Sequence, residues 1–227
     1  VQAAAGVLRH GVDVPGLAVA IHKAIPAEAG LGGGSADAAA VLVALQHLLD
    51  DAPSDEAMLE IAAAIGSDVP ACFMGGLMRM TGRGEDVKQL TPVDGWVAVV
   101  AVPSTRLSTA TVYRAWSDLP AGTRPREIEA PAALRDLADV LVNDLEPAAL
   151  LVDPELARFR DAVRDAAGVE PLLAGSGSAY VVVVDASIGS EVMAASISAA
   201  LAADGFAPRL VAAGAPAQRG VDLLGEG

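Results

Sequence analysis

A glycine-rich stretch at residues 26–40 has the composition of a phosphate-binding loop that leads into a helix. It reads PAEAGLGGGSADAAA. The three consecutive glycines at 32–34 can adopt backbone conformations that other residues avoid, so several N–H groups can converge on one anion. We expect Ser35 to cap the helix that follows and Asp37 to lie in its first turn. The helix dipole adds positive charge at this end, so the stretch predicts a site for a di- or triphosphate.

Two common phosphate-binding motifs do not fit this stretch. No Gly-Lys-Ser/Thr follows the glycines, which excludes a Walker loop, and no Gly-x-Gly-x-x-Gly opens a strand–helix–strand unit here. The alternative is a flexible turn before an ordinary helix. Four glycines with a serine at the expected helix start favour the phosphate site over that alternative.

Asp68 is the second residue that could do chemistry. It lies in the segment IGSDVP at residues 65–70, after an expected helix and before an apolar run. A carboxylate beside apolar residues would be partly desolvated, which is the environment that tunes a catalytic base. On these residues alone, a loop aspartate that caps the chain after Gly66 remains an equal alternative.

The composition excludes several classes of protein and site. A net charge of −14 argues against a nucleic-acid partner, and no apolar run is long enough to span a membrane. The single cysteine, Cys72, excludes an internal disulfide and fits a cytoplasmic protein, since no segment resembles a signal peptide. His10, His22 and His47 have no metal-ligand spacing, so we predict neither a protein-held metal site nor a thiol nucleophile. The oligomeric state is left unpredicted.

The elements that must position these residues follow from the hydrophobic periodicity. The pattern predicts helices at 1–9, 35–49, 55–65, 108–116, 132–142, 144–151, 154–167 and 191–203, and strands at 17–23, 96–102, 179–184 and 208–212. Turn-forming residues cluster at 91–95 and suggest a domain boundary there. We therefore predict an α+β protein with domains at residues 1–94 and 95–227.

Five segments together resemble the GHMP kinases. They are the glycine-rich stretch, IGSDVP (65–70), TGRGE (81–85), NDLEP (143–147) and AGSGSAY (174–180), in that order. The triple glycine followed by Ser-Ala-Asp is similar to the family branch that phosphorylates 4-diphosphocytidyl-2-C-methyl-D-erythritol. The resemblance implies the GHMP kinase two-domain fold, with a ribosomal S5 domain 2-like N-terminal part and a ferredoxin-like C-terminal domain.

The resemblance also implies a reaction and the residues that serve it. The reaction is transfer of the ATP γ-phosphoryl group to the 2-hydroxyl of the substrate, a step of the non-mevalonate isoprenoid pathway, with Mg²⁺ arriving on ATP and Asp68 as the base. The ATP-binding residues implied by the resemblance are Lys23, Pro26, Ala27, Glu28, Ala29, Gly30, Leu31, Gly32, Gly33, Gly34, Ser35 and Ala36. For Lys23, an ordinary solvated lysine is the alternative.

Substrate contacts are implied for the second domain. Gly175, Ser176 and Gly177 match a Gly/Ser loop that closes over the phosphates, although on sequence alone they form a turn before a strand. Thr109 and Tyr113 stand where the family offers a threonine and a stacking aromatic to cytidine. Core packing of Tyr113 with its helix neighbours Val112 and Trp116 is the alternative. Asn143 is read as a structural cap.

The chain departs from the family in one respect. The family begins with roughly eighty further residues that hold a Pro-Gly-Lys and a Gly-Tyr-His segment, and neither segment occurs in these 227 residues. We therefore expect little or no kinase turnover from this chain alone. Two alternatives stay open: another GHMP kinase that acts on a different small alcohol, and a nucleotide-binding remnant without turnover.

Overall fold

The computed structural model describes residues 2–9, 11, 16–84, 86–120, 141–217 and 220–222. The chain forms two compact units, described separately below. The first unit comprises Val1–Ala24, Gly32–Pro92 and Ala217–Gly227, and the second comprises Ile25–Leu31 and Val93–Pro216. The glycine-rich stretch is thus divided between the units, whereas the domain division at residues 94 and 95 stays a prediction.

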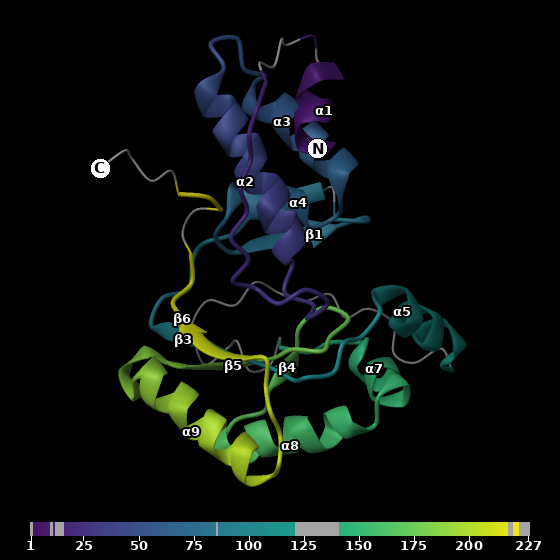
Figure 1. The fold of residues 1–227 in the computed structure, drawn as a ribbon, viewed down its shortest axis with the longest axis vertical. Coiled ribbons are helices and arrows are strands. Elements are labelled where there is room, and N and C mark those ends of the chain that lie inside the picture. The colour runs from purple at the N-terminus through teal and green to yellow at the C-terminus, as the bar shows by residue number, and fades with distance from the viewer. Residues whose placement is uncertain are drawn as a thin grey trace. The chain divides into compact units, whose positions relative to one another are not determined.

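The first unit is a helical cluster with one small hairpin (Figure 1). Its elements are α1 (Gln2–Arg9), α2 (Gly33–Leu48), α3 (Asp55–Ile65), α4 (Val69–Met74) and the antiparallel pair β1 (Met78–Thr81) and β2 (Asp86–Gln89). Apolar residues recur on α2 with helical spacing, so one stripe of Ala39, Leu42 and Leu45 is buried in the core. Ser54 caps α3 by accepting a hydrogen bond from the Ala57 N–H.

The apolar run at 17–23 differs from its prediction. The chain there is extended but has no β-ladder partner among the described residues, so the predicted strand is wrong for this structure. Leu17, Val19 and Ile21 are exposed. Apolar composition favours an extended backbone locally, but a strand also requires a partner, which local sequence cannot supply.

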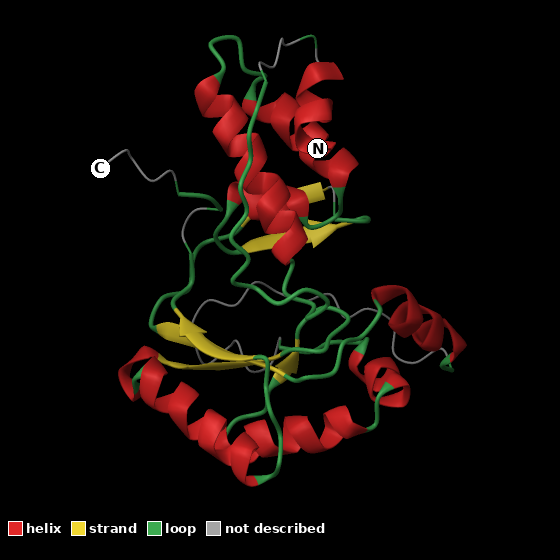
Figure 2. Cartoon of the chain, viewed as in Figure 1, coloured by secondary structure: helices red, strands yellow, loops and turns green. Residues whose placement is uncertain are grey.

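The second unit is a four-stranded antiparallel sheet with helices (Figure 2). Its elements are β3 (Trp96–Val102), α5 (Thr109–Asp118), α7 (Glu146–Val152), α8 (Glu155–Ala167), β4 (Leu172–Leu173), β5 (Tyr180–Asp185), the 3₁₀ turn η1 (Ala186–Ile188), α9 (Ser190–Ala203) and β6 (Leu210–Gly214). The strand order is β4-β5-β3-β6. This β-α-β-β-α-β arrangement is ferredoxin-like, as the resemblance implies.

Packing of α8 and α9 on the sheet forms the main core of the second unit (Figure 1). β3 is a continuous apolar run, WVAVVAV, and it pairs with β5 on one side and β6 on the other. The core side chains from β5, α8 and α9 include Tyr180, Phe159 and Leu201. Residues 132–140 of the helix predicted at 132–142 lie outside the described residues, and residues 141 and 142 are not helical. Within the described residues, no helix is long and apolar enough to cross a membrane.

Candidate functional site

The glycine-rich stretch leads directly into the N-terminus of α2. The helix begins at Gly33, with Gly32 as its N-cap at a left-handed φ of 64° and with no side-chain cap hydrogen bond. The prediction that Ser35 caps this helix and that Asp37 lies in its first turn is therefore wrong. Glycine adopts the left-handed conformation at little cost, so the helix starts two residues earlier than a serine cap would allow.

This early start leaves N–H donors available at the end of the glycine run. The first helical hydrogen bond runs from the Ala36 N–H to the Gly32 carbonyl, over 2.9 Å. The N–H groups of Gly33, Gly34 and Ser35 therefore have no acceptor within the helix. A methyl group on Gly34 would meet no atom within 4 Å, so the space beside this backbone is open. Free donors at the positive end of a helix suit a phosphate group.

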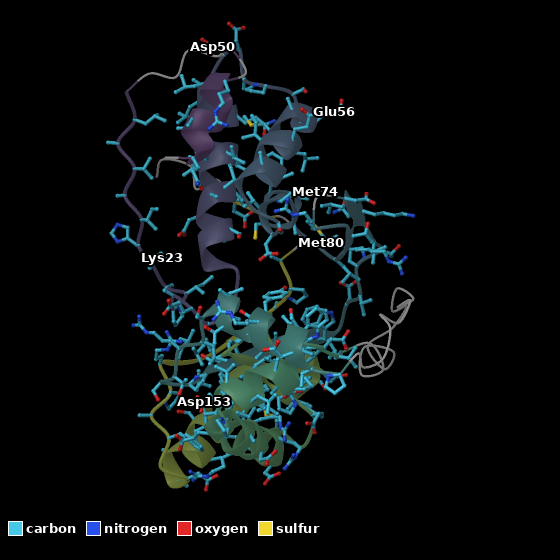
Figure 3. The ribbon with its side chains drawn as sticks, turned by 90° about the vertical axis from the view of Figure 1, so that its right-hand side faces the viewer. Lys23, Asp50, Glu56, Met74, Met80 and Asp153 are labelled. Atoms are coloured by element: carbon cyan, nitrogen blue, oxygen red, sulfur yellow. The ribbon has the colours of Figure 1, made fainter. Side chains whose placement is uncertain are left out.

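Lys23 lies beside the same helix start, on the extended segment that precedes the loop (Figure 3). Its ammonium group donates to the Asp37 carboxylate over 2.6 Å and to the Gly33 carbonyl over 3.2 Å. The Lys23 side chain is 42% exposed, so the ion pair leaves it accessible to a ligand. The structure thus brings Lys23 together with the glycine run, and a nucleotide contact remains a prediction.

The earlier part of the stretch packs against the Gly/Ser turn of the second unit. The Ala179 N–H donates to the Ala29 carbonyl over 3.0 Å. Gly30 has a φ of 76°, and a methyl group there would lie 2.9 Å from the Gly177 carbonyl oxygen and closer still to that of Ala174. Glycine is therefore required at position 30, because main-chain atoms occupy the space of a side chain.

Several polar side chains fix the Gly/Ser turn in place. The hydroxyl groups of Thr109 and Ser176 are hydrogen-bonded over 2.9 Å, so two predicted substrate-binding residues lie together. The buried Ser178 hydroxyl donates to the Thr105 carbonyl over 2.6 Å. These side-chain hydrogen bonds, together with the backbone bond from the Gly177 N–H to the Ala174 carbonyl, stabilise the conformation of the turn.

Asn143 makes contacts beyond its own turn. Its side-chain oxygen accepts from the Leu145 N–H over 2.9 Å and so closes the turn before α7, whose N-cap is Leu145 with no side-chain cap hydrogen bond. Its side-chain amide also donates to the carbonyls of Leu173 and Gly175, each over 2.7 Å. These contacts span about thirty positions of sequence, and no local pattern signals them.

Arg209 supports the glycine-rich stretch, and no pattern in the sequence predicts this role. Its guanidinium donates to four main-chain carbonyls, two of which belong to Ala27 and Glu28 in the glycine-rich stretch. Burial, followed by repulsion from Arg106, lowers the pKa of Arg209 below its ordinary value. A lone arginine between a proline and a short apolar strand carries no signal of such a role.

Tyr113 lies on α5 with its ring 51% exposed, whereas Val112 beside it is fully buried. Trp116 on the same helix is also exposed, at 45%. Core packing of Tyr113, the alternative left open by the sequence, is therefore wrong. The exposed ring is available for stacking on a base, which remains a prediction.

Asp68 occupies the N-cap position of α4 but makes no side-chain cap hydrogen bond. It is exposed, so the predicted partial desolvation is wrong for this chain. The turn of the β1–β2 hairpin packs against this segment: Gly84 has a φ of 109°, and a methyl group there would lie 3.0 Å from the Ser67 Cβ. The carboxylate is therefore accessible, and its role as the base remains a prediction.

Cys72 lies one helical turn after Asp68, and its N–H donates to the Asp68 carbonyl over 3.1 Å. Burial, followed by the negative charge of Asp68, raises the pKa of Cys72 above its ordinary value. A raised pKa favours the thiol over the thiolate, which is the nucleophilic form. Within the residues that the structure describes, no cluster of three or more His, Cys, Asp or Glu side chains could hold a metal ion.

Comparison with known proteins agrees with this arrangement. Residues 1–76 match the GHMP kinases N terminal domain. A 4-diphosphocytidyl-2-C-methyl-D-erythritol kinase from Nocardioides sp. is 39% identical over 199 residues, which cover 84% of this chain and 67% of the relative. The chain belongs to the 4-diphosphocytidyl-2-C-methyl-D-erythritol kinase family. The resemblance inferred from the five segments is thereby confirmed.

Further relatives extend this result to the fold. The kinase of the same name from Pelotomaculum thermopropionicum is 40% identical over 77% of this chain, and the chain spans 61% of its length. A solved 4-(cytidine 5'-diphospho)-2C-methyl-D-erythritol kinase is 36% identical with a TM-score of 0.66, covering 78% of this chain and 65% of its own. Homoserine kinase from Cytophaga hutchinsonii shares the fold, with a TM-score of 0.64 and 20% sequence identity. The match covers 87% of this chain and 69% of the homoserine kinase. The predicted GHMP kinase fold is confirmed.

Proposed function

We propose that this chain provides the nucleotide site and the base of an ATP-dependent kinase. The reaction transfers the γ-phosphoryl group of ATP to the 2-hydroxyl of 4-diphosphocytidyl-2-C-methyl-D-erythritol. The observation that carries the proposal is the N-terminus of α2. The N–H groups of residues 33–35 have no acceptor within the helix, and Lys23 lies beside them. Family membership supports the choice of reaction.

The chain's own groups serve the phosphates in two ways. The N–H groups of residues 33–35 hydrogen-bond phosphate oxygens, and the positive end of the α2 dipole stabilises their charge. Lys23 adds a formal positive charge at the same end, while its bond to Asp37 limits the positions of its ammonium group. Such preorganised donors stabilise charge that spreads over the transferred group in the transition state.

Mg²⁺ enters with the nucleotide as part of the substrate. Bound with ATP, it would offset the negative charge of the phosphates, which is its usual role in phosphoryl transfer.

Asp68 acts as the base. Its carboxylate accepts the proton of the 2-hydroxyl as the hydroxyl oxygen forms a bond to the γ-phosphorus. The bond between that phosphorus and the oxygen of the leaving ADP breaks in the same step. Its exposure and its lack of a side-chain cap bond leave both oxygens able to accept a proton. Thr109 and Tyr113 offer a hydroxyl and an exposed ring to the cytidine.

Nucleotide binding without turnover is the second candidate. It is favoured by one observation, that the groups gathered at the N-terminus of α2, its first N–H groups and Lys23, account for phosphate binding alone. Calorimetry with Mg·ATP and an assay of substrate-dependent ADP release separate the two. Saturable ATP binding with substrate-dependent release supports the kinase, binding without release supports the second candidate, and no binding refutes both.

A pair of carboxylate variants tests the assignment of the base. Asp68→Asn should lower ADP release by about 10²–10⁴-fold, because general base catalysis contributes that much, and should leave ATP affinity unchanged. Asp50→Asn is the matched control, because Asp50 is an exposed carboxylate of the same unit in the turn after α2 (Figure 3). Equal release from the two variants would contradict the role of Asp68.

A further inference from the structure

Arg209 joins the glycine-rich stretch to the loop that follows β3. The residues of the stretch that it contacts, Ala27 and Glu28, and the loop after β3 all belong to the second unit. The guanidinium donates from Nε to the Pro103 carbonyl over 2.9 Å, from Nη1 to the Ala27 carbonyl over 2.8 Å, and from Nη2 to the carbonyls of Thr105 and Glu28 over 3.3 and 3.5 Å. A planar guanidinium has five N–H donors spread over a fixed fork and can serve four separate carbonyls at once, whereas a lysine has three donors on a single nitrogen.

The turn that Arg209 contacts is one that needs external support. Glu28 has a φ of 56° and is the one non-glycine residue with a positive φ in the described part of the chain. A residue with a side chain avoids this conformation unless its surroundings impose it. Here the carbonyls of residues 27 and 28 accept from Arg209, and the next carbonyl, that of Ala29, accepts from the Ala179 N–H.

The side chain of Arg209 is not needed to hold β6 in the sheet. The Arg209 main-chain N–H donates to the Val102 carbonyl over 2.7 Å, and this bond survives any side-chain substitution other than proline. The ion pair between Arg106 and Glu28 is no substitute for the clamp, because its atoms are 3.8 Å apart and both side chains are more than half exposed. The guanidinium therefore serves the loops rather than the strand.

We propose that Arg209 is a positioning residue for the nucleotide, a role that rests on the proposed function. It holds residues 27–29 in the conformation from which the following glycines enter α2 with their N–H groups free. Arg209 does not touch the phosphates. It acts through the backbone of the turn, so its removal weakens phosphate binding by letting the turn relax.

The test measures Mg·ATP affinity by calorimetry on the full chain and five variants. Arg209→Met keeps the aliphatic stem and removes every donor, and it should raise the ATP dissociation constant about tenfold or more. Arg209→Lys can serve one or two of the four carbonyls, so it should fall between the wild type and Arg209→Met. Arg106→Met is the matched control and should change the constant by less than about twofold.

A double substitution separates positioning from general stability. Glycine adopts a positive φ at little cost, so in a Glu28→Gly background the turn needs less support. The effect of Arg209→Met on the ATP dissociation constant should then shrink to about threefold or less, whereas a general structural role would leave it unchanged. Circular dichroism of each variant shows that it is folded, and Arg209→Lys decides the matter if Arg209→Met does not fold.

The outcomes distinguish this inference from the proposed function. ATP binding by the wild type with unchanged affinity in both Arg209 variants overturns the role of Arg209 and leaves the proposed function standing. An Arg209→Met effect that persists in the Glu28→Gly background also overturns it. Failure of the wild type to bind ATP overturns both.

Discussion

Gly30→Ala should destabilise the second unit far more than an alanine at another left-handed glycine. At position 30 the new methyl group would lie 2.9 Å from the Gly177 carbonyl oxygen and closer to that of Ala174, and φ is 76°. Main-chain oxygens cannot rotate away as the end of a flexible side chain can. One of the two segments must therefore move.

The expected cost is the sum of three effects. A positive φ costs a non-glycine residue about 1–2 kcal/mol, overpacking about 1–3 kcal/mol, and loss of the neighbouring bond from the Ala179 N–H to the Ala29 carbonyl about 1 kcal/mol. Together they reduce the free energy of unfolding by about 3–6 kcal/mol, which is a large part of the stability of an ordinary domain. Gly205→Ala is the control, since its φ is 82° and nothing lies within 4 Å of the methyl position.

Urea unfolding followed by tryptophan fluorescence measures this difference. Both tryptophans, Trp96 and Trp116, belong to the second unit, so the signal reports that unit. With a slope of about 3 kcal/mol per molar urea, the upper end of the usual range, Gly30→Ala should lower the midpoint by about 1–2 M and Gly205→Ala by less than half of that. Equal midpoints for the two variants would refute the close packing of the glycine-rich stretch on the Gly/Ser turn.

Three further substitutions test other parts of the structure. Tyr180→Phe removes a buried hydroxyl that donates to Glu146 over 3.0 Å and should cost about 1–2 kcal/mol at neutral pH by the same urea assay. Burial, and after it the charge of Glu146, raises the pKa of Tyr180 above its ordinary value of 10.0. The contribution of Tyr180 to the free energy of unfolding should therefore be full below about pH 10 and be lost above it, where the tyrosine of the unfolded chain ionises. An equal fall in the stability of Tyr180→Phe above about pH 10 would contradict this. Asn143→Ala leaves two carbonyls of the Gly/Ser turn without their donor and should cost about 2–3 kcal/mol, and an unchanged urea midpoint would argue against the clamp. Lys23→Met should change the free energy of unfolding by less than about 1 kcal/mol, because its ion pair with Asp37 is partly exposed. The same substitution should weaken ATP binding in calorimetry about tenfold, and an unchanged affinity would show that Lys23 does not contact the nucleotide.

Local sequence determined most of the elements and the identity of the family. Helix periodicity predicted α2, α3 and α8 closely, because each buries one apolar stripe whose spacing is visible in the chain. The run at 96–102 predicted β3, because a continuous apolar run is typical of a buried strand and every residue of β3 is buried or half-buried. The five segments predicted the GHMP kinase family because its motifs keep residue types at fixed local spacing.

Tertiary structure decided the features that depend on contacts distant in sequence. The extended run at 17–23 is not a strand here because pairing requires a partner that composition cannot reveal. The helix α2 begins at Gly33 and not at Ser35, because the left-handed Gly32 ends the loop earlier. Asp68 is exposed although the next residues, Val69 and Pro70, are buried. The supports of the site, above all Arg209 with its contacts about 180 positions away, carry no local signal. A single arginine gains its role only when folding brings four carbonyls within reach of its guanidinium.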